Sequence, residues 1–386
     1  MPSIPDNTVF LIAESLRINP LWYREASLGL EESARRRKCT ITMATDVREI
    51  PNGVRSVVIL GHSHSWIMKT ITCLRNHNVK SVLIGGVPSS FGEDVSGIMY
   101  GAKTAVSEIL KFFTKKGRTK IALAGIDYSN TVDLQKVQAF KDTCAMLGIA
   151  SGSDDIYDIT SEWRNIGCFF RRIGDYDAVI CANDACGAFI VSACRKTGVK
   201  IPSRLSVCGM GDMLISNYTN PTLSTATRSF YKSGEKAFDI WRLLNQDEQR
   251  LSIVVTLPTE IRERQSTNPE SSAISEESCQ IQDINYYFDN SVCISEITRM
   301  RNLQHVLSSS DYIDVRILIE MLNGNSNERI AELLPLAPST VAYRFKKLYE
   351  TANINGKSEL MKLFQDDIDL QKLKTDSAKA RGIRTY

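Results

Sequence analysis

The chain has 386 residues, of which 43% are hydrophobic and 24% are charged, and its formal net charge at pH 7 is +3. This length exceeds one ordinary domain, and the balance is that of a soluble globular protein with two or three packed units. The small net charge neither demands nor excludes a polyanionic partner, so a nucleic-acid function has to rest on a motif.

Cysteine usage and the N-terminus indicate the compartment. The ten cysteines form no CxxC pair and no zinc-like group with the four histidines, which favours reduced thiols and neither a metal nor another cofactor. Met1 to Phe10 lacks a basic segment followed by an apolar stretch, and no segment reaches the length of a transmembrane helix. The sequence therefore predicts a cytoplasmic protein with no membrane partner.

From Val9 to about Glu260, short apolar runs alternate with longer amphipathic stretches. The runs are Val9–Ala13, Cys39–Ala44, Val57–Leu60, Ser81–Gly86, Ile121–Gly125, Ala178–Ala182 and Leu205–Gly209. The helical stretches are Pro20–Arg36, Gly97–Lys115, Val132–Leu147 and Asp184–Gly198. This alternation predicts parallel sheets with helices on both faces, and roughly ten strands favour two lobes over one wide sheet. We expect the chain to cross between the lobes near Arg118, near Thr225–Arg228 and near Val255.

A polar stretch then separates this region from the rest of the chain. Residues 266–275 read STNPESSAIS, with no apolar periodicity, and acidic residues follow. We interpret residues 269–307 as a linker. Ile297–Leu307 is compatible with a short connecting helix that either helps two chains associate or packs on its own domain.

From Ser308 onward the pattern is helical. Asp314–Leu322 has one apolar face and ends at Asn323–Gly324, and Ser326 is placed to cap the next helix. A further stop follows at Pro335, and Pro338 suits the first turn of a third helix. Three short helices with tight turns are typical of a helix-turn-helix.

The third helix has two distinct faces. Val341, Phe345 and Leu348 share one stripe and are expected to pack. The residues we predict to contact DNA lie off that stripe or at the N-terminus of the helix, where hydroxyls and free backbone N–H groups suit phosphate. They are Ser339, Thr340, Ala342, Tyr343, Arg344, Lys346 and Lys347.

The C-terminal motifs carry a resemblance to a known family. GNSNERIAELLPLAPSTVAYRFKKLYETANINGKSEL resembles the LuxR-type helix-turn-helix, whose pattern has G-x-S-N-x-x-I-A followed by P-S-T-V. The resemblance covers Ser308 to Leu363 and implies binding of double-stranded DNA. Ala342 departs from it, since a lysine is usual there, and Pro335 stands where a glycine or an aromatic residue is common.

The larger N-terminal region resembles the effector-binding domain of the lactose-repressor family, which shares its fold with sugar-binding periplasmic proteins. The resemblance spans roughly Val9 to Glu263, and its most specific run is DAVICANDACGAFIVSACRKTGVKIPSRLSVCGMGD from Asp177 to Asp212. It implies a type I two-lobed α/β fold in which loops after the strands line a ligand crevice between the lobes. On those loops we predict ligand-binding residues Arg17, Trp22, Ser63, Asp127, Lys136, Asn183, Asp184 and Asp212.

Two positions in this region depart from the resemblance. Lys136 stands near the family's ligand-gripping arginine, and Gly211 stands where its sugar-gripping acid is usual, with Asp212 following. A lysine cannot make the forked contact of arginine, and glycine has no carboxylate, so an ordinary pyranose is not the expected ligand. Asp184, at the start of a helix, and Trp22 also have structural interpretations, as an N-cap and as a core residue.

Together these features predict a homodimeric transcription regulator and not an enzyme. Residues 1–268 would sense an unidentified small molecule, and residues 308–386, with a basic tail, would bind DNA. No P-loop, HExxH or nucleophile motif is present. The alternative is a ligand-less dimerisation or protein-sensing module attached to a helical docking domain. The departures at Lys136 and Gly211 motivate the ligand-less module. The docking domain is suggested by residues 308–386, which hold twelve Lys or Arg against eleven Asp or Glu.

Overall fold

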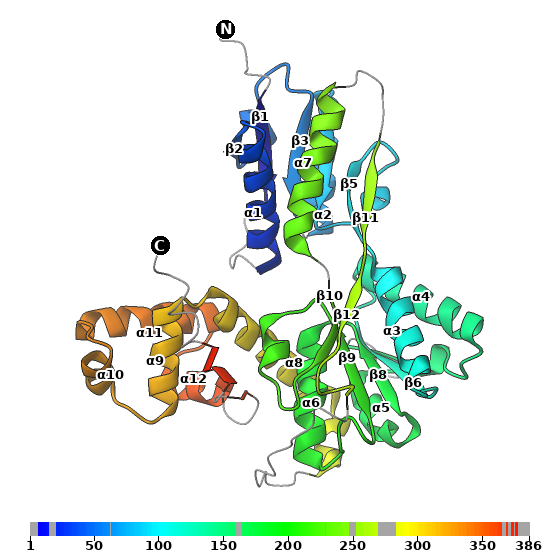
Figure 1. Ribbon diagram of the computed structural model, residues 1–386, viewed down its shortest axis with the longest axis vertical. Helices are drawn as coiled ribbons and strands as arrows, with labels where there is room; N and C mark the ends of the chain where they lie inside the picture. Colours follow the sequence, from blue (N-terminus) through cyan, green and yellow to red (C-terminus); the bar gives the residue numbers. More distant parts are fainter. Residues whose placement is uncertain are drawn as a thin grey trace. The chain divides into compact units, whose positions relative to one another are not determined.

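The computed structural model describes residues 7–14, 21–61, 63–159, 164–227, 229–246, 252–268, 283–364, 368–369, 372–373 and 375–376. The chain folds into two compact units. Unit 1 comprises Met1–Ala102 and Arg228–Thr259, and unit 2 comprises Lys103–Thr227 and Glu260–Tyr386. The chain therefore passes between the units three times (Figure 1).

Unit 1 contains a six-stranded sheet of order β11-β5-β4-β3-β1-β2, in which all neighbouring strands are parallel. Its strands are β1 (Thr8–Ala13), β2 (Thr40–Ala44), β3 (Ser56–Leu60), β4 (Lys80–Ile84), β5 (Ser96–Tyr100) and β11 (Val254–Leu257). Its helices are α1 (Leu21–Arg36), α2 (His64–Asn76) and α7 (Phe230–Gln246), with 3-10 turns η1 (Val47–Glu49) and η2 (Pro88–Ser90).

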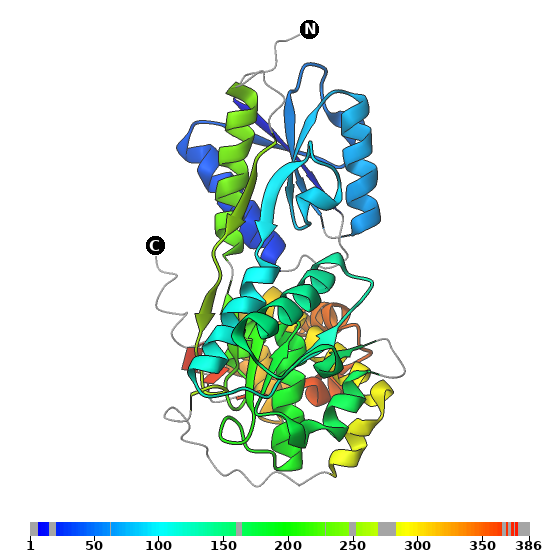
Figure 2. The ribbon, with the colours of Figure 1, turned by 90° about the vertical axis from the view of Figure 1, so that its right-hand side faces the viewer.

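Alternation along the strands of unit 1 produces two apolar layers. Val9 and Leu11 of β1 pack in a cluster with α1 and α7, whereas Phe10 and Ile12 pack in a cluster with α2. Successive side chains of a strand point to opposite faces, so a continuously apolar strand requires cover on both sides. Figure 2 shows α2 on one face of the sheet and α1 with α7 on the other.

Unit 2 contains a second six-stranded sheet of order β12-β10-β9-β8-β6-β7, in which only the β10–β12 pairing is antiparallel. Its strands are β6 (Ile121–Ile126), β7 (Ile156–Asp158), β8 (Ala178–Cys181), β9 (Ser206–Met210), β10 (Ser224–Thr227) and β12 (Glu260–Arg262). Helices α3 (Ala102–Lys115) and α4 (Thr131–Leu147) cover one face, and α5 (Ile166–Arg171) and α6 (Asp184–Thr197) cover the other (Figure 2). Short turns are η3 (Ser153–Asp155), η4 (Ile173–Asp175) and η5 (Leu214–Asn217).

The C-terminal part of unit 2 is helical in the described residues. It consists of η7 (Ile284–Phe288), α8 (Asn290–Ser309), α9 (Tyr312–Leu322), α10 (Asn327–Leu333), α11 (Pro338–Ala352) and α12 (Lys357–Phe364). The expected helix-start signals are present. Ser326 caps α10 by accepting a hydrogen bond from the Arg329 N–H, and Pro338 is the first residue of α11. Asn353, in the left-handed region with a φ of 53°, ends α11.

Helix α8 is part of the core of unit 2 and longer than the connecting helix expected from the sequence. The expected helix was Ile297–Leu307, and the observed one runs from Asn290 to Ser309. Its buried face is Cys293, Ile297, Met300, Leu303, Gln304, Val306 and Leu307. Apolar members of this face belong to one cluster with residues of α6 and with residues of α9, α11 and α12. Of the two alternatives for this helix, packing on its own chain is therefore the observed one. Residues 269–282 of the expected linker lie outside the described residues.

Most of the predicted fold is confirmed, with two corrections. The two separate sheets, and the helices at Leu21–Arg36, Thr131–Leu147 and Asp184–Thr197, agree with the expectation. The stretch Gly97–Lys115 was expected to be entirely helical, but strand β5 occupies residues 96–100. Buried Val95, Ile98, Ala102 and Val106 recur at intervals of three and four residues, so a strand next to a helix imitated one longer helix.

The second correction concerns the first chain crossing. It falls at Ala102–Lys103 and not near Arg118, because α3 packs on the sheet of unit 2 through residues such as Val106 and Phe113. The other crossings, at Thr227–Arg228 and Thr259–Glu260, lie at or within a few residues of the expected positions. Among the described residues, no helix combines the length and apolar character that a membrane span requires.

The burial of α8 leads to a stability prediction. We expect Leu303→Ala to lower the free energy of unfolding of unit 2 by about 2–5 kcal/mol, because a fully buried leucine would leave a cavity at the centre of the shared core. The matched control is Ile294→Ala on the same helix, where the side chain is 39% exposed, and a change below about 1 kcal/mol is expected. Urea denaturation measures both; equal losses would contradict the docked position of α8.

Candidate functional site

The carboxyl ends of three neighbouring strands in unit 2 bring four of the eight predicted ligand residues to one edge of the sheet. Asp127 follows β6, Asn183 and Asp184 follow β8, and Asp212 follows β9. Because β9, β8 and β6 are adjacent and parallel, the loops after them share an edge. The structure thus confirms that these loops lie together.

Asp184 has no exposed surface. Its carboxylate accepts hydrogen bonds from the Thr225 hydroxyl at 2.6 Å and from the Met213 N–H at 2.6 Å. Burial raises the pKa of the Asp184 carboxyl from 3.8 to about 6, although both hydrogen bonds act in the opposite direction. Asp184, which follows β8, is therefore hydrogen-bonded both to the loop after β9 and to strand β10, where Thr225 lies.

Asp212 is held by two arginines. One carboxylate oxygen accepts from the Arg264 guanidinium at 2.6 Å, and the other pairs with Arg262. The backbone of Asp212 lies in the left-handed region, with a φ of 51°, and its N–H donates to the Thr225 hydroxyl at 3.2 Å. This acid was expected to grip a ligand, but in this structure its charge is neutralised by residues just after β12 and at its end.

Lys136, on α4, is also engaged internally. Its ammonium group forms an ion pair with Asp133 at 2.6 Å and donates to the Ala182 carbonyl at 2.8 Å, and the side chain is 6% exposed. Asp133 in turn accepts from the Asp127 N–H at 2.9 Å. Sequence reasoning missed Asp133, although its i,i+3 spacing from a lysine on a predicted helix was an available signal.

The two other predicted residues of this edge, Asn183 and Asp127, accept local hydrogen bonds. The Asn183 side chain accepts from the Cys186 N–H at 2.9 Å at the start of α6, and Asp127 accepts from the N–H and the hydroxyl of Ser129. The N-cap role considered for Asp184 therefore belongs to its neighbour Asn183. Asn183 and Asp127 remain partly exposed, so both retain atoms that can face solvent.

In unit 1, the predicted residues lie at the corresponding edge of its sheet. Ser63, after β3, donates through its N–H to Glu14 at 3.0 Å and through its hydroxyl to the same carboxylate. Trp22 is partly buried against the core at the start of α1, with its ring 5.7 Å from Tyr23 and 6.3 Å from Phe230 between centroids. Glu14, 8% exposed, was missed by sequence reasoning, and Arg17 lies outside the described residues.

The predicted DNA-contacting helix shows the expected division of faces. Val341, Phe345 and Leu348 are each at most 2% exposed, which confirms the packing stripe. Ser339, Ala342, Tyr343, Lys346 and Lys347 are exposed, and Thr340 is half-buried. Tyr343 is the most prominent, at 69% exposure. Figure 1 shows α11 together with α9, α10 and α12 in the helical part of the chain.

Arg344 departs from the expectation that it is free. One of its nitrogens lies 2.7 Å from Asp314 and 2.9 Å from Asp311, and the side chain is 19% exposed. Asp311 and Asp314 form the capping box of α9, so Arg344 joins α11 to the start of α9. Lys347 lies 3.7 Å from Asp314 but stays 48% exposed. Of the predicted cations, Lys346 and Lys347 are therefore the ones presented to solvent.

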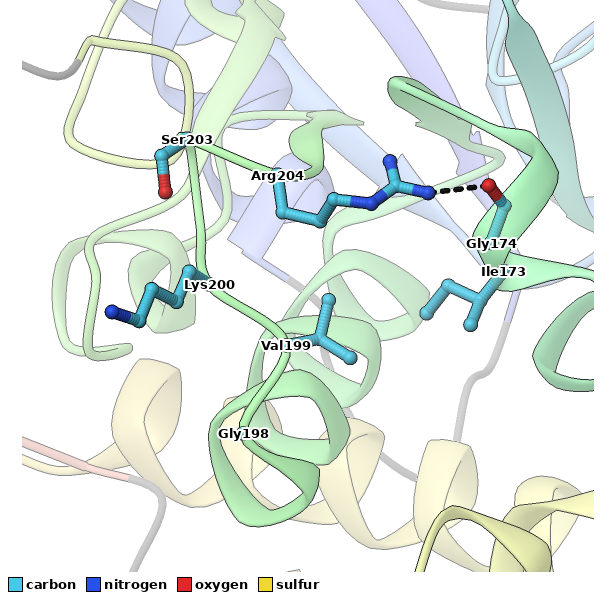
Figure 3. Close-up of a pocket in the computed structure, with 7 residues that line it drawn as sticks. All are labelled: Ile173, Gly174, Gly198, Val199, Lys200, Ser203 and Arg204. Carbon is cyan, nitrogen blue, oxygen red and sulfur yellow. Dashed lines mark hydrogen bonds between the residues drawn. The ribbon is translucent and has the colours of Figure 1, made fainter.

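A surface hollow of about 570 Å³ lies elsewhere in unit 2 (Figure 3). It is lined by Ile173, Gly174, Gly198, Val199, Lys200, Ser203 and Arg204. Residues 198–204 precede β9, so the hollow is at the amino-terminal edge of that strand, whereas the predicted ligand residues follow their strands. The Arg204 guanidinium donates to the carbonyls of Gly174 and Tyr176. The hollow is therefore separate from the edge that holds Asp184.

The part of the chain that the structure describes contains no group of three or more His, Cys, Asp or Glu suited to a metal ion. Nine of its cysteines are free thiols, of which Cys181, Cys186, Cys194 and Cys208 are buried in the core of unit 2. Burial raises the pKa of the Cys194 thiol to about 12, which keeps it protonated and unreactive.

Comparison with known proteins defines the class. Residues 110–267 match the model of the periplasmic binding protein-like domain. The CelR–cellobiose complex has a TM-score of 0.54 at 18% identity, covering 68% of this chain and 84% of that one. The regulator CcpA of Lactococcus lactis has the same score and identity, covering 68% of this chain and all of that one. The fold is the two-lobed periplasmic-binding-protein-like fold with two sheets rich in parallel pairs.

Part of the chain is similar to curated transcription regulators. The HTH-type repressor PurR of Vibrio cholerae is 25% identical over 158 residues, 40% of this chain and 47% of the relative. DegA of Bacillus subtilis is 23% identical over 166 residues, and GalR of Escherichia coli is 24% identical over 179 residues. The matches cover 47% to 51% of the length of these relatives. Residues 110–267 thus match a periplasmic-binding-protein-like domain, and these partial relatives are transcription regulators and not enzymes.

The raised pKa of Asp184 leads to a pH prediction. At pH values between 3.8, the ordinary pKa of this carboxyl group, and about 6, the folded protein binds the Asp184 proton more tightly than the unfolded chain does. The stability linked to this proton is therefore present at low pH and lost as the pH rises through about 6. We expect the parent to lose stability relative to Asp184→Asn as the pH rises. The unfolding free energy of the parent minus that of the variant should fall by up to about 3 kcal/mol between about pH 4 and pH 7. Urea titrations across this range measure the difference; a flat difference would refute the assignment.

Proposed function

We propose that this protein is a ligand-responsive transcription regulator whose helices α9 to α12 bind double-stranded DNA. The observation that carries the proposal is the two-faced helix α11. Its apolar stripe is buried in the core, while Tyr343, Lys346 and Lys347 stand exposed on the remaining surface. Phosphate neutralisation by cations and base-edge contacts by an exposed side chain are the two components of DNA recognition.

The surroundings of α11 support this role. Helices α10 and α11 are separated by only Leu334–Ala337, in the order and spacing of a LuxR-type helix-turn-helix. Ser339 lies exposed in the first turn of α11, where free backbone N–H groups favour an anion. The homologues of the N-terminal region are named as HTH-type transcription regulators, which agrees with a DNA-binding segment on the same chain.

The remainder of the proposal concerns partners. Regulators of this kind read two half-sites with two symmetry-related recognition helices, so the working form would be a homodimer in the cytoplasm. A small polar effector would bind at the carboxyl edge of the sheet of unit 2, where Asn183 and Asp127 are partly exposed. Effector binding would then change the affinity for DNA.

The DNA assignment leads to a pair of opposite expectations. Lys346→Ala should weaken binding to selected and random duplexes alike and lower the slope of log affinity against log salt by about 1, because one phosphate contact is lost. Tyr343→Ala should cost about 1–3 kcal/mol on the selected site and little on random DNA, because a base contact carries the sequence information. Binding isotherms across a salt series, on genomic fragments selected by the parent protein, measure both.

The matched control for this pair is Lys115→Ala, which removes the same charge from an exposed position on α3. It should leave both affinities and the salt slope unchanged. If Lys346→Ala and Tyr343→Ala also bind both duplexes as the parent does, α11 is not the DNA-contacting helix. The helical part would then be a docking module.

A second candidate function is supported by the ion pairs at the sheet edge of unit 2. Lys136 is paired with Asp133, and Asp212 with Arg262 and Arg264, so the charges expected to hold a ligand are already satisfied by the protein. A ligand would have to displace these partners or bind without them, at a cost in desolvated charge. This observation favours a unit that has lost its small molecule and senses another protein.

A ligand screen separates the two candidates. A compound present at 100 times its Kd should stabilise a sensing domain by about 2.7 kcal/mol, which raises the melting temperature measurably. We expect a sugar, nucleobase or amino acid panel to contain such a compound, and Asn183→Asp to bind it more weakly. The carboxylate introduced by this substitution would still cap α6 but lacks amide donors. A panel without any stabilising compound would support the ligand-less alternative, and unchanged affinity in the variant would leave Asn183 with its capping role alone.

A further inference from the structure

The loop after β9 links the sheet edge of unit 2 to α8 over a distance of two residues. The Met213 N–H donates to the buried Asp184 carboxylate at 2.6 Å. Two positions later, the Ile215 N–H donates to the Gln304 side-chain oxygen of α8 at 2.8 Å. One short segment is therefore hydrogen-bonded at both ends. Met213 bonds to the edge where the predicted effector residues lie, and Ile215 bonds to α8, which packs against α11 and α12.

The segment that makes this link is partly buried. It is the 3-10 turn η5, in which Ile215 and Ser216 have no exposed surface. The Leu223 N–H returns to the Ser216 carbonyl at 2.9 Å, which closes the loop against the start of β10. Turn η5 packs against both α6 and α8. In a close-packed interior such a turn moves as a body, so a displacement at Met213 is passed to Ile215.

Gln304 and α8, on the other side of this link, are also packed and hydrogen-bonded. Gln304 is 7% exposed and lies between Leu303 and Val306, which belong to the same apolar cluster as Phe345 of α11. Arg299 of α8 donates to the Leu363 carbonyl of α12 at 3.2 Å. The residue that follows η5 is also bonded to the C-terminal part of the chain, because the Asp369 N–H donates to the Tyr218 carbonyl at 2.7 Å. Helix α8 thus contacts η5 and the helices proposed to bind DNA.

We propose that η5 and its hydrogen bond to Gln304 form the coupling element of this protein, through which a change at the Asp184 edge alters the position of α8 and hence of α11. This inference rests on the proposed function, since it names how a signal from the effector edge reaches the DNA-binding helices. Gln304 is a positioning residue in this mechanism: it contacts neither the effector edge nor DNA. Coupling of this kind requires an element whose position depends on both the effector edge and the DNA-binding helices. Met213 and η5 meet this requirement, because they are hydrogen-bonded to Asp184 at the edge and to Gln304 of α8.

The experiment uses the full chain and a substitution as the trigger, so that no effector has to be identified. Asp184→Asn replaces one hydrogen-bond acceptor of the buried carboxyl by a donor and thereby perturbs the Met213 bond. It is combined with Gln304→Leu, which removes the acceptor for the Ile215 N–H. The matched control is Asn302→Leu, an equivalent amide-to-leucine change at a half-buried position of the same helix. Amide hydrogen exchange is followed in residues 297–307 and 341–348, with residues 105–113 of α3 as the internal reference.

With coupling through η5, Asp184→Asn speeds exchange in residues 297–307 and 341–348 in the parent and in the Asn302→Leu background, but not in the Gln304→Leu background. Where DNA binding is measured, the affinity change caused by Asp184→Asn should be about 5-fold or more in the first two backgrounds and absent in the third. An unchanged effect in the Gln304→Leu background, or no effect on α8 in the parent, overturns the proposal.

Two features keep the test decisive. If Gln304→Leu does not fold, Thr225→Val replaces it, because this substitution removes one hydrogen bond to the Asp184 carboxylate without altering α8. Residues 214–217 and 297–307 must then lose protection from amide exchange together. Protection lost in residues 214–217 alone overturns the coupling. The exchange measurement does not require DNA, so a parent protein that fails to bind DNA refutes the proposed function, while the exchange pattern still decides the coupling.

Discussion

The architecture of unit 2 depends on the burial of α8. This helix presents a continuous apolar face to α6 on one side and shares its cluster with residues of α9, α11 and α12 on the other. A helix of 20 residues buried in this way lies within a single core, so the helical C-terminal part does not form a core of its own. The docking of α8 therefore determines where the exposed face of α11 is held relative to the sheet of unit 2.

A second constraint is the neutralisation of charge at the sheet edge. Lys136, Asp184 and Asp212 are the residues that a ligand would be expected to meet, yet each has partners from the protein itself. Buried charge is tolerated only when it is paired or hydrogen-bonded, so these contacts are the condition for placing such residues at the edge. They also hold the edge together, since Asp184, after β8, is hydrogen-bonded to the loop after β9 and to strand β10.

These two constraints meet in the loop after β9. The same segment that supplies Asp212 and Met213 to the edge supplies η5 to α8. Helices α9 to α12 belong to the same unit as β9, because their apolar residues share one cluster with those of α6 and α8. The loop after β9 is joined directly to α8 by the hydrogen bond between Ile215 and Gln304.

The sequence by itself determined the elements and most of their order. Apolar runs of four to six residues, the Asn183-Asp184 pair after β8, and the capping signals at Ser326 and Pro338 are local patterns, and local patterns decide where strands and helices begin and end. The division of α11 into a packed and an exposed face followed from its 3.6-residue period alone. One local ambiguity misled the prediction, where β5 and α3 together imitated a longer helix.

The tertiary structure alone decided which polar residues are free. Arg344 is off the apolar stripe of α11 but is taken by Asp311 and Asp314, some thirty positions earlier in the chain, and Asp212 by Arg262 and Arg264, some fifty positions later. It also decided that α8 is a core helix and not a linker, because its partners lie on α6 and η5. Pairings of this kind depend on which surfaces the fold brings together, and no periodicity within a single segment records them.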